Sequence, residues 1–210
     1  NNNNIAEITN CLFFANQAAE GGAVHVNNYS KTYDFNDCVF LSNVATGGGG
    51  GAVSVQSSAY FTRCRFEGNS ATAPAGAGGA TYNQANAAWV VARRCVFKNN
   101  TAGATGTGAG GAHGPSGGFS PGSFTAENCL FVGNAGDYTI RLAGNQTGAI
   151  ILRHCTMADN VGGGVLSSHG LIVSNSIIAN NGHTGIRTTF ASPGINYNVV
   201  YGHATNYSGT

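Results

Sequence analysis

Apolar residues recur along the chain in a short motif, Cys-x-Phe-x-x-Asn, whose copies begin 26 to 34 residues apart. Cys and Phe are two residues apart, so in a β-strand both side chains lie on the same face. That face is apolar in every copy, and we expect it to point into a core while the residues between point outward. The sixth copy has Met157 in place of Phe. The copies begin at Cys11, Cys38, Cys64, Cys95, Cys129 and Cys155.

Two further copies and a second motif extend this pattern. Residues 175–180 place Asn in the Cys position and Ile177 in the Phe position, and residues 198–202 are a degenerate copy. Gly-Gly-Ala follows each of the first four copies, and its small residues fit a corner with little side-chain room. Gly and β-branched residues in these segments argue against helices. Short strands repeated in this way are typical of a solenoid whose coils stack about 4.8 Å apart.

The Asn that ends each motif predicts a second repeated contact. Asn tolerates the left-handed backbone conformation of a corner, and stacked Asn side chains can hydrogen-bond from coil to coil as an amide ladder. Between this Asn and Gly-Gly, a segment of small residues lengthens from 17–20 in the first repeat to 101–109 in the fourth, and we expect these segments to leave one corner as loops. The predicted ladder residues are Asn16, Asn43, Asn69, Asn100, Asn134, Asn160 and Asn180.

Phe-x-x-Asn alternating with Gly-Gly-Ala-aliphatic resembles the repeats of polymorphic outer-membrane proteins and related secreted bacterial β-helix proteins. Residues 13–16 with 21–24 and residues 40–43 with 50–53 carry the resemblance. It implies an all-β fold, a right-handed parallel β-helix of about seven to eight coils, at the cell surface or beyond. We expect one domain over residues 1–210, with regular coils over 1–113 and longer-loop, degenerate coils over 114–210, where Gly-Gly-Ala fades.

The six cysteines occupy one repeat position, and three interpretations remain open. They can form a buried stack of free thiols among Phe, Val, Ile and Leu, each acting as a small apolar side chain. They can form disulfides between successive coils, although parallel side chains in register do not easily reach the required dihedral of about 90°. They can bind a metal, although Cys-x-x-Cys is absent. The disulfide pairs would be Cys11–Cys38, Cys64–Cys95 and Cys129–Cys155.

Composition excludes several classes of protein. Charged residues make up only 8% of the chain and the formal net charge is +1, which is too few basic residues for nucleic-acid binding by phosphate neutralisation. The 42% hydrophobic content argues against a disordered chain. No run of apolar residues reaches the length of about 18 that a membrane span needs, so we expect no span.

Catalytic chemistry finds little support in the motifs. The eight acidic residues are scattered over the repeat positions, and the six His residues show no metal-binding spacing. We therefore nominate no catalytic residue, no metal ligand and no cofactor. One candidate strip for an anionic ligand flanks the Cys-x-Phe strands, and it could hold a glycan. Its residues are Arg63, Arg65, Arg93, Arg94, Lys98 and Arg153.

Large apolar residues also occupy outward positions of the first two repeats, namely Leu12, Phe14, Val39 and Leu41. An exposed apolar sheet face marks a contact surface, and we regard these residues as a candidate self-contact. The sequence thus predicts an extracellular or cell-surface structural protein without catalysis, a homo-oligomer or filament subunit or an adhesin-like stalk. The alternative is a β-helix protein that binds or cleaves polysaccharides with its basic strip.

Overall fold

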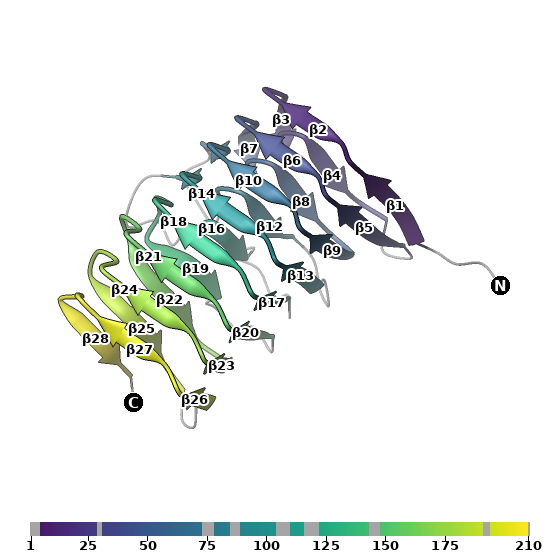
Figure 1. Ribbon diagram of the computed structural model, residues 1–210. Coiled ribbons are helices and arrows are strands. Elements are labelled where there is room, and N and C mark those ends of the chain that lie inside the picture. The colour runs from purple at the N-terminus through teal and green to yellow at the C-terminus, as the bar shows by residue number, and fades with distance from the viewer. Residues whose placement is uncertain are drawn as a thin grey trace.

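The structure is a stack of parallel coils built from short strands (Figure 1). It is a computed structural model, and it describes residues 5–28, 31–72, 78–84, 89–103, 110–115, 122–142, 148–190 and 194–209. Within these ranges there are 28 strands and no helix. Every strand pair is parallel and lies between neighbouring coils, in the manner of Phe40 opposite Phe66. The predicted all-β parallel β-helix is therefore confirmed.

Sheets A and B meet at one corner and run through all eight coils. Coils are numbered here by their strand in sheet A. Sheet A consists of β1 (Ile5–Thr9), β5 (Thr32–Asn36), β9 (Ser58–Thr62), β13 (Trp89–Arg93), β17 (Ser123–Glu127), β20 (Ala149–Arg153), β23 (Gly170–Ser174) and β26 (Gly194–Asn196). Sheet B consists of β2 (Leu12–Phe14), β6 (Val39–Leu41), β10 (Arg65–Glu67), β14 (Val96–Lys98), β18 (Leu130–Val132), β21 (Thr156–Ala158), β24 (Ile177–Ala179) and β27 (Val199–Tyr201).

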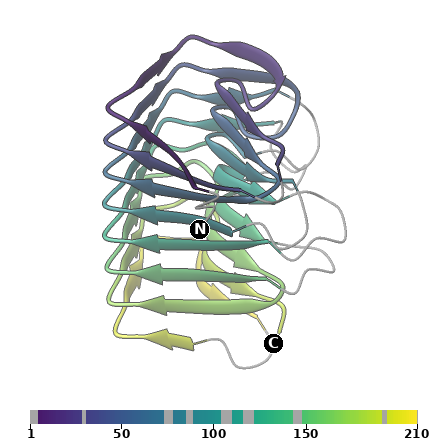
Figure 2. The ribbon, with the colours of Figure 1, turned by 90° about the vertical axis from the view of Figure 1, so that its right-hand side faces the viewer.

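Sheet D completes every coil and sheet C contributes to the first four, and Figure 2 shows the coils stacked from the purple N-terminal one to the yellow C-terminal one. Sheet D consists of β4 (Val24–Val26), β8 (Val53–Val55), β12 (Thr81–Asn83), β16 (Gly110–Pro115), β19 (Tyr138–Leu142), β22 (Gly163–Ser167), β25 (Thr184–Thr188) and β28 (Thr205–Ser208). Sheet C occurs in the first four coils and consists of β3 (Gln17–Glu20), β7 (Val44–Gly48), β11 (Ser70–Ala71) and β15 (Thr101–Ala102).

Sheet C corrects one expectation from the sequence. The segments after the ladder Asn were expected to be loops, but their first residues pair in register, as Ala45 does with Ala71. Ala45, Ala71 and Ala102 are buried in a small cluster of their own, which explains the preference for Ala at this position. The remaining parts of the expected loops, residues 73–77 and 104–109, lie outside the described residues.

The interior is filled by aromatic rings that stack along the rod. Phe13, Phe40, Phe66, Phe97 and Phe131 lie one above the next, with ring centroids 4.7 to 4.9 Å apart and nearly parallel planes. This spacing is that of neighbouring strands, so each coil adds one ring to the stack. The stack continues as Met157, Ile178 and Val200.

The interior also contains polar groups that the predicted apolar core did not include. His113 of β16 is fully buried, its ring lies 4.2 Å from that of Phe124, and its Nδ1 is 2.9 Å from Thr81 Oγ1. Its Nε2 is buried without a hydrogen-bond partner. Val53 lies at the equivalent position of sheet D two coils earlier. At this core position the fourth coil therefore has a histidine where the second coil has a valine.

Two rows of left-handed residues form the corners on either side of sheet B. One row directly precedes the Cys position, with φ between 50° and 55°, and the other directly precedes the ladder Asn. The left-handed residue is therefore the neighbour of the ladder Asn and not the ladder Asn itself, which corrects the expected role of that residue. The first row is Asn10, Asp37, Arg63, Arg94, Asn128, His154, Asn175 and Tyr197.

The Gly-Gly-Ala corner depends on close backbone contact. A Cβ atom on Gly51 would lie 2.1 Å from the carbonyl oxygen of Gly79, and one on Gly79 would lie 2.0 Å from that of Gly111. Only glycine fits these positions without displacement of the backbone. The alanine that follows, Ala52 in the second coil, is fully buried against the core.

Candidate functional site

The ladder asparagines form a continuous chain of hydrogen bonds. The backbone N–H and Nδ2 of Asn69 both donate to Asn100 Oδ1, at 3.1 and 2.9 Å. Nδ2 of Asn69 also donates to the carbonyl oxygen of Phe40 in the preceding coil, at 2.9 Å. The same pattern links Asn100 to Asn134 and Asn134 to Asn160. Each interior amide thereby satisfies its own polar atoms and caps a strand of sheet B.

Asn180 does not belong to this ladder, which is a correction. Nδ2 of Asn160 donates to Asn181 Oδ1 at 2.7 Å, whereas Asn180 is a left-handed corner residue with φ 49°. The repeat is shifted by one residue because Ile178, not Ile177, is buried in the Phe position. Ser176 therefore takes the Cys position, and its Oγ accepts a hydrogen bond from the Cys155 N–H.

The cysteines lie in a single file at the corner between sheets A and B. Cys38, Cys64, Cys95, Cys129 and Cys155 are buried, Cys11 is exposed, and all six are free thiols in the structure. The N–H of Cys64 contacts Cys95 Sγ at 3.4 Å, and that of Cys95 contacts Cys129 Sγ at 3.4 Å. Burial raises the pKa of the Cys38 thiol. The raised pKa disfavours the thiolate at Cys38, so this side chain acts as a small apolar group with weak hydrogen bonds.

The basic strip lies beside this file, and most of its members contact carboxylates. Arg63 forms two hydrogen bonds of 2.6 Å to Asp37, and these lower the pKa of that carboxyl. Glu67 pairs with both Arg65 and Lys98. The strip is thus a mixed-charge network.

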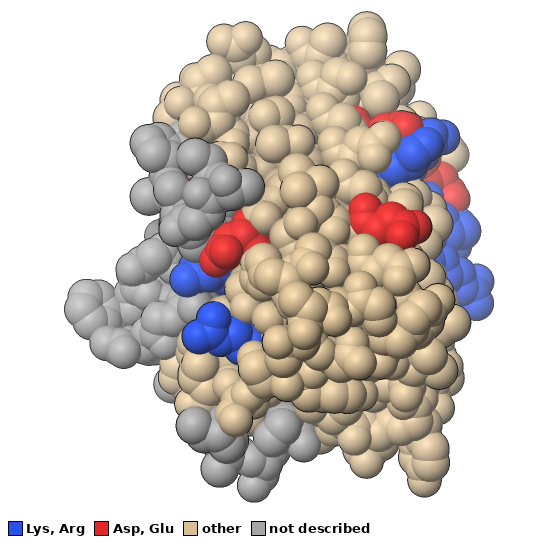
Figure 3. Space-filling view, turned by 90° about the vertical axis from the view of Figure 1, so that its left-hand side faces the viewer, with Lys and Arg blue, Asp and Glu red and all other residues tan. Residues whose placement is uncertain are grey.

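One carboxylate is shared in the same way further along the strip. Glu127 accepts from Arg93 at 3.2 Å and from Arg153 at 3.3 Å, and these two guanidinium groups lower its pKa. Arg94 has no carboxylate partner among the residues that the structure describes. The three shared or paired carboxylates leave the strip with more positive than negative groups. Figure 3 shows Lys and Arg gathering along one edge of an otherwise mostly uncharged surface, with Asp and Glu among them.

A groove of about 440 Å³ runs beside these groups along three consecutive coils. Arg94, Asn128 and His154, one from each of coils 4 to 6, line it from the left-handed corner row. Val96 and Leu130 line it from sheet B. The groove was not predicted, because its shape depends on the corner conformation that these residues share.

A carboxylate pair was also missed in the sequence. Glu7 and Asp34 are register partners in β1 and β5, and the pKa of Asp34 is raised by partial burial and by the nearby Glu7. Both lie four residues before the Cys of their repeat. Aligning the repeats on Cys therefore places Glu7 and Asp34 at the same position of successive coils. Arg93, Glu127 and Arg153 share an offset of two residues before Cys in the same manner.

These groups do not form a metal centre. Among the residues that the structure describes, no cluster of three or more His, Cys, Asp or Glu side chains has the arrangement of a metal site. The described part of the chain also contains no helix with the length and apolar character of a membrane span.

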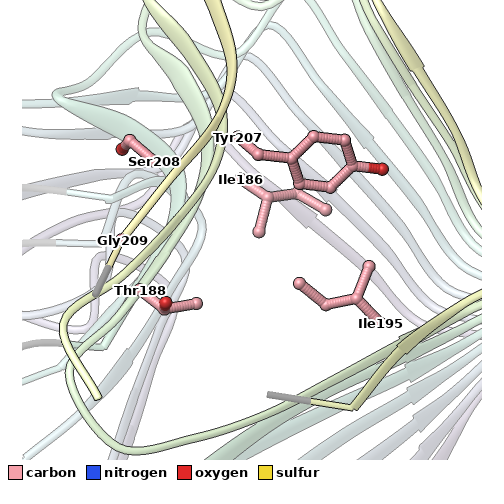
Figure 4. A pocket seen from close by; sticks show the side chains of 6 residues that line it. All are labelled: Ile186, Thr188, Ile195, Tyr207, Ser208 and Gly209. Carbon is pink, nitrogen blue, oxygen red and sulfur yellow. The ribbon is translucent and has the colours of Figure 1, made fainter. Parts of the chain in front are cut away.

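A smaller cavity of about 240 Å³ lies at the last coil (Figure 4). Ile186 of β25, Ile195 of β26 and Tyr207 of β28 line it together with Thr188 and Ser208. Gly209 is the sixth lining residue, and the lining contains no Asp, Glu, His, Lys, Arg or Cys. The cavity therefore continues the apolar interior of the rod.

The outward residues of sheet B include the predicted self-contact. Leu12 and Phe14 are exposed, while Val39 and Leu41 are half-buried by their neighbours in the sheet. In the last coils Ile177, Val199 and Tyr201 are exposed on the same face. Between these two apolar parts lie the charged side chains of β10 and Lys98.

Comparison with known proteins bears on the third coil. Residues 63–84 match the model of the Chlamydia polymorphic membrane protein repeat. The matched stretch contains β10, β11 and β12, with Phe66, the ladder residue Asn69 and the Gly-Gly-Ala corner. No curated protein and no solved structure matches the chain. The repeat match supports the resemblance that the motifs carry.

Proposed function

We propose that this chain is a structural segment of a bacterial surface stalk, which associates with further copies of itself through the outer face of sheet B. The observation that carries the proposal is the exposure of large apolar side chains on this face. Leu12 and Phe14 are 65% and 59% exposed at one end of the sheet, and Val199 and Tyr201 are 53% and 50% exposed at the other. A contiguous exposed apolar face marks a contact surface.

The distribution of charge on the face favours a second copy as its occupant. Arg65, Glu67 and Lys98 form a central belt that contains both signs of charge, with apolar positions on either side of it. A copy turned by 180° would place belt against belt and apolar part against apolar part. Such two-fold, self-complementary contacts are the commonest in protein assemblies.

The test is the mass of the protein in solution. Sedimentation velocity of the natural full-length protein should show a species larger than a monomer, and Leu12→Ser combined with Phe14→Ser should shift it toward the monomer. The matched control is Trp89→Ser, which removes an exposed aromatic from sheet A instead. A monomer at all concentrations, or an equal effect of Trp89→Ser, would overturn the proposal.

A further inference from the structure

We propose that the groove along coils 4 to 6 binds an acidic polysaccharide, with Arg94, Asn128 and His154 as the residues that contact it. This goes beyond the structural role, since it assigns a ligand class to the corner row; Val96, Leu130 and Thr156 are the groove residues that belong to sheet B. The three residues come from successive coils, so their backbones follow the stack at steps of about 4.8 Å. A site of this form fits a linear polymer that lies along the rod.

Charge supports an anionic ligand. Six of the nine Lys and Arg residues of the chain lie in the strip beside the groove, against three carboxylates that they share. The carboxylates already hold Arg93 and Arg153 in place, while the guanidinium of Arg94 contacts no carboxylate in the described part of the chain. Arg94 is exposed at the groove and can form two parallel hydrogen bonds to a carboxylate or sulfate group.

The remaining lining favours a sugar over other polyanions. The amide of Asn128 and the imidazole of His154 can donate to or accept from hydroxyl groups. Val96 and Leu130 supply an apolar wall that can contact the carbon face of a sugar ring. Among the described residues no Phe, Tyr or Trp lines the groove, so the large aromatic platform on which the bases of single-stranded nucleic acids stack is missing.

The left-handed row itself supplies the best variant. Asn occupies the position of Arg94 in other coils, at Asn10, Asn128 and Asn175, with the same backbone conformation. Arg94→Asn therefore removes the charge at a position where Asn is already accommodated, and His154→Asn is built on the same reasoning. The matched control is Arg187→Gln, which removes one exposed charge from sheet D.

The experiment measures binding of the protein to immobilised heparin, which is sulfated, to polygalacturonate, which carries only carboxylates, and to neutral dextran. We expect binding to one or both acidic polymers and not to dextran, and the pattern distinguishes sulfate from carboxylate recognition. Arg94→Asn should weaken binding about tenfold and His154→Asn less, with Arg187→Gln close to wild type. Thermal unfolding of each variant verifies that the fold is kept.

Three outcomes would overturn the proposal. The first is no binding to either acidic polymer. The second is equal weakening by Arg94→Asn and Arg187→Gln, which would indicate attraction by the whole protein and not by the groove. The third is binding of polyglutamate as strong as that of the acidic polysaccharides, which would remove the role assigned to the sugar. The oligomeric state is measured separately, so failure here leaves the contact between copies unaffected.

Discussion

Asn69 Oδ1 accepts two hydrogen bonds from Asn43, one from the backbone N–H at 3.0 Å and one from Nδ2 at 2.9 Å. One side chain thus satisfies two buried donors in the coil before it and, through its own Nδ2, a carbonyl oxygen of that same coil. The ladder therefore contributes to stability less by the strength of any single bond than by leaving no polar group of the corner unpaired.

Replacement of Asn69 by Ala should consequently be costly. The change leaves the buried N–H of Asn43 without its acceptor and removes one of the two bonds that Asn43 Nδ2 donates, while the bond of Nδ2 to the carbonyl oxygen of Phe13 is kept. It also removes the amide that donates to the carbonyl oxygen of Phe40. We expect the free energy of unfolding to fall by about 3–5 kcal/mol. Chemical denaturation measures the effect, and Asn36→Ala on the outer face of β5 is the control, with an expected change below about 0.5 kcal/mol. Equal effects of the two changes would contradict the assigned role.

The aromatic stack makes a second prediction. Phe66 is fully buried between Phe40 and Phe97, with ring centroids 4.7 and 4.8 Å away. Phe66→Ala should lower the free energy of unfolding by about 3–5 kcal/mol, because it removes an aromatic ring from a closely packed core. Phe66→Met should cost much less, since Met157 already fills this position in the sixth coil. A loss below 1 kcal/mol in Phe66→Ala, read from the same denaturation curves, would count against a packed stack.

The buried His113 makes stability dependent on pH. Burial lowers its pKa from 6.5 to about 3, so below pH 6.5 the unfolded chain binds a proton that the folded chain does not. With respect to His113, the free energy of unfolding is therefore at its full value above pH 6.5. It should fall by about 1.4 kcal/mol per pH unit as the pH drops toward 3. His113→Val, the residue found at Val53, removes this dependence.

The measurement compares wild type and His113→Val by denaturation at pH 7 and pH 5. Wild type should lose about 2 kcal/mol more than the variant over this interval. Other acidic groups titrate equally in both proteins, so the difference isolates His113. An identical loss in the two proteins would show that the histidine is able to take up its proton in the folded state.

The carboxylate pair on sheet A makes a fourth prediction. The pKa of Asp34 is raised by partial burial and by Glu7, so its ionised form is disfavoured in the folded state. The stabilising contribution of protonated Asp34 is thus present below the ordinary pKa of Asp. It is lost as the pH rises through the raised pKa of Asp34 in the folded state. Glu7→Gln should lower the pKa of Asp34 and raise stability at pH 7 by a fraction of a kcal/mol, since solvent screens the pair. Titration of Asp34 followed by NMR provides the check, and an unchanged midpoint would contradict it.

The sequence predicts the elements of this fold well where the motif is strong. Cys and Phe two residues apart indicate the inward face, and the spacing of repeats indicates the stacking, because both follow from strand geometry alone. The prediction fails at Asn180, where the motif has lost Cys and Phe and burial of Ile178 decides the register. It also fails for sheet C, since its Ala and Gly residues have low intrinsic strand preference and pair because neighbouring coils present the same segment.

The candidate site was predictable only in part. The basic residues of the strip are visible in the sequence, but their sharing of Glu67 and Glu127 depends on which residues lie opposite each other in successive coils. The groove beside Arg94 depends in addition on the left-handed corner. Arg94, Asn128 and His154 are polar, so no hydrophobic pattern indicates them.

The hydrogen bonds of the asparagine ladder all have the same direction. Each Oδ1 from Asn43 to Asn181 faces the coil that precedes it, and none among these faces the coil that follows. A cut through the rod between two such coils would therefore create two unlike surfaces: one with the N–H and Nδ2 donors of a ladder Asn beside a Phe carbonyl oxygen, the other with an Oδ1 acceptor beside an Nδ2 hydrogen. Severed pieces could rejoin in only one orientation, so any lengthening of this architecture, by gene duplication or by docking of ends, has to preserve the same polarity.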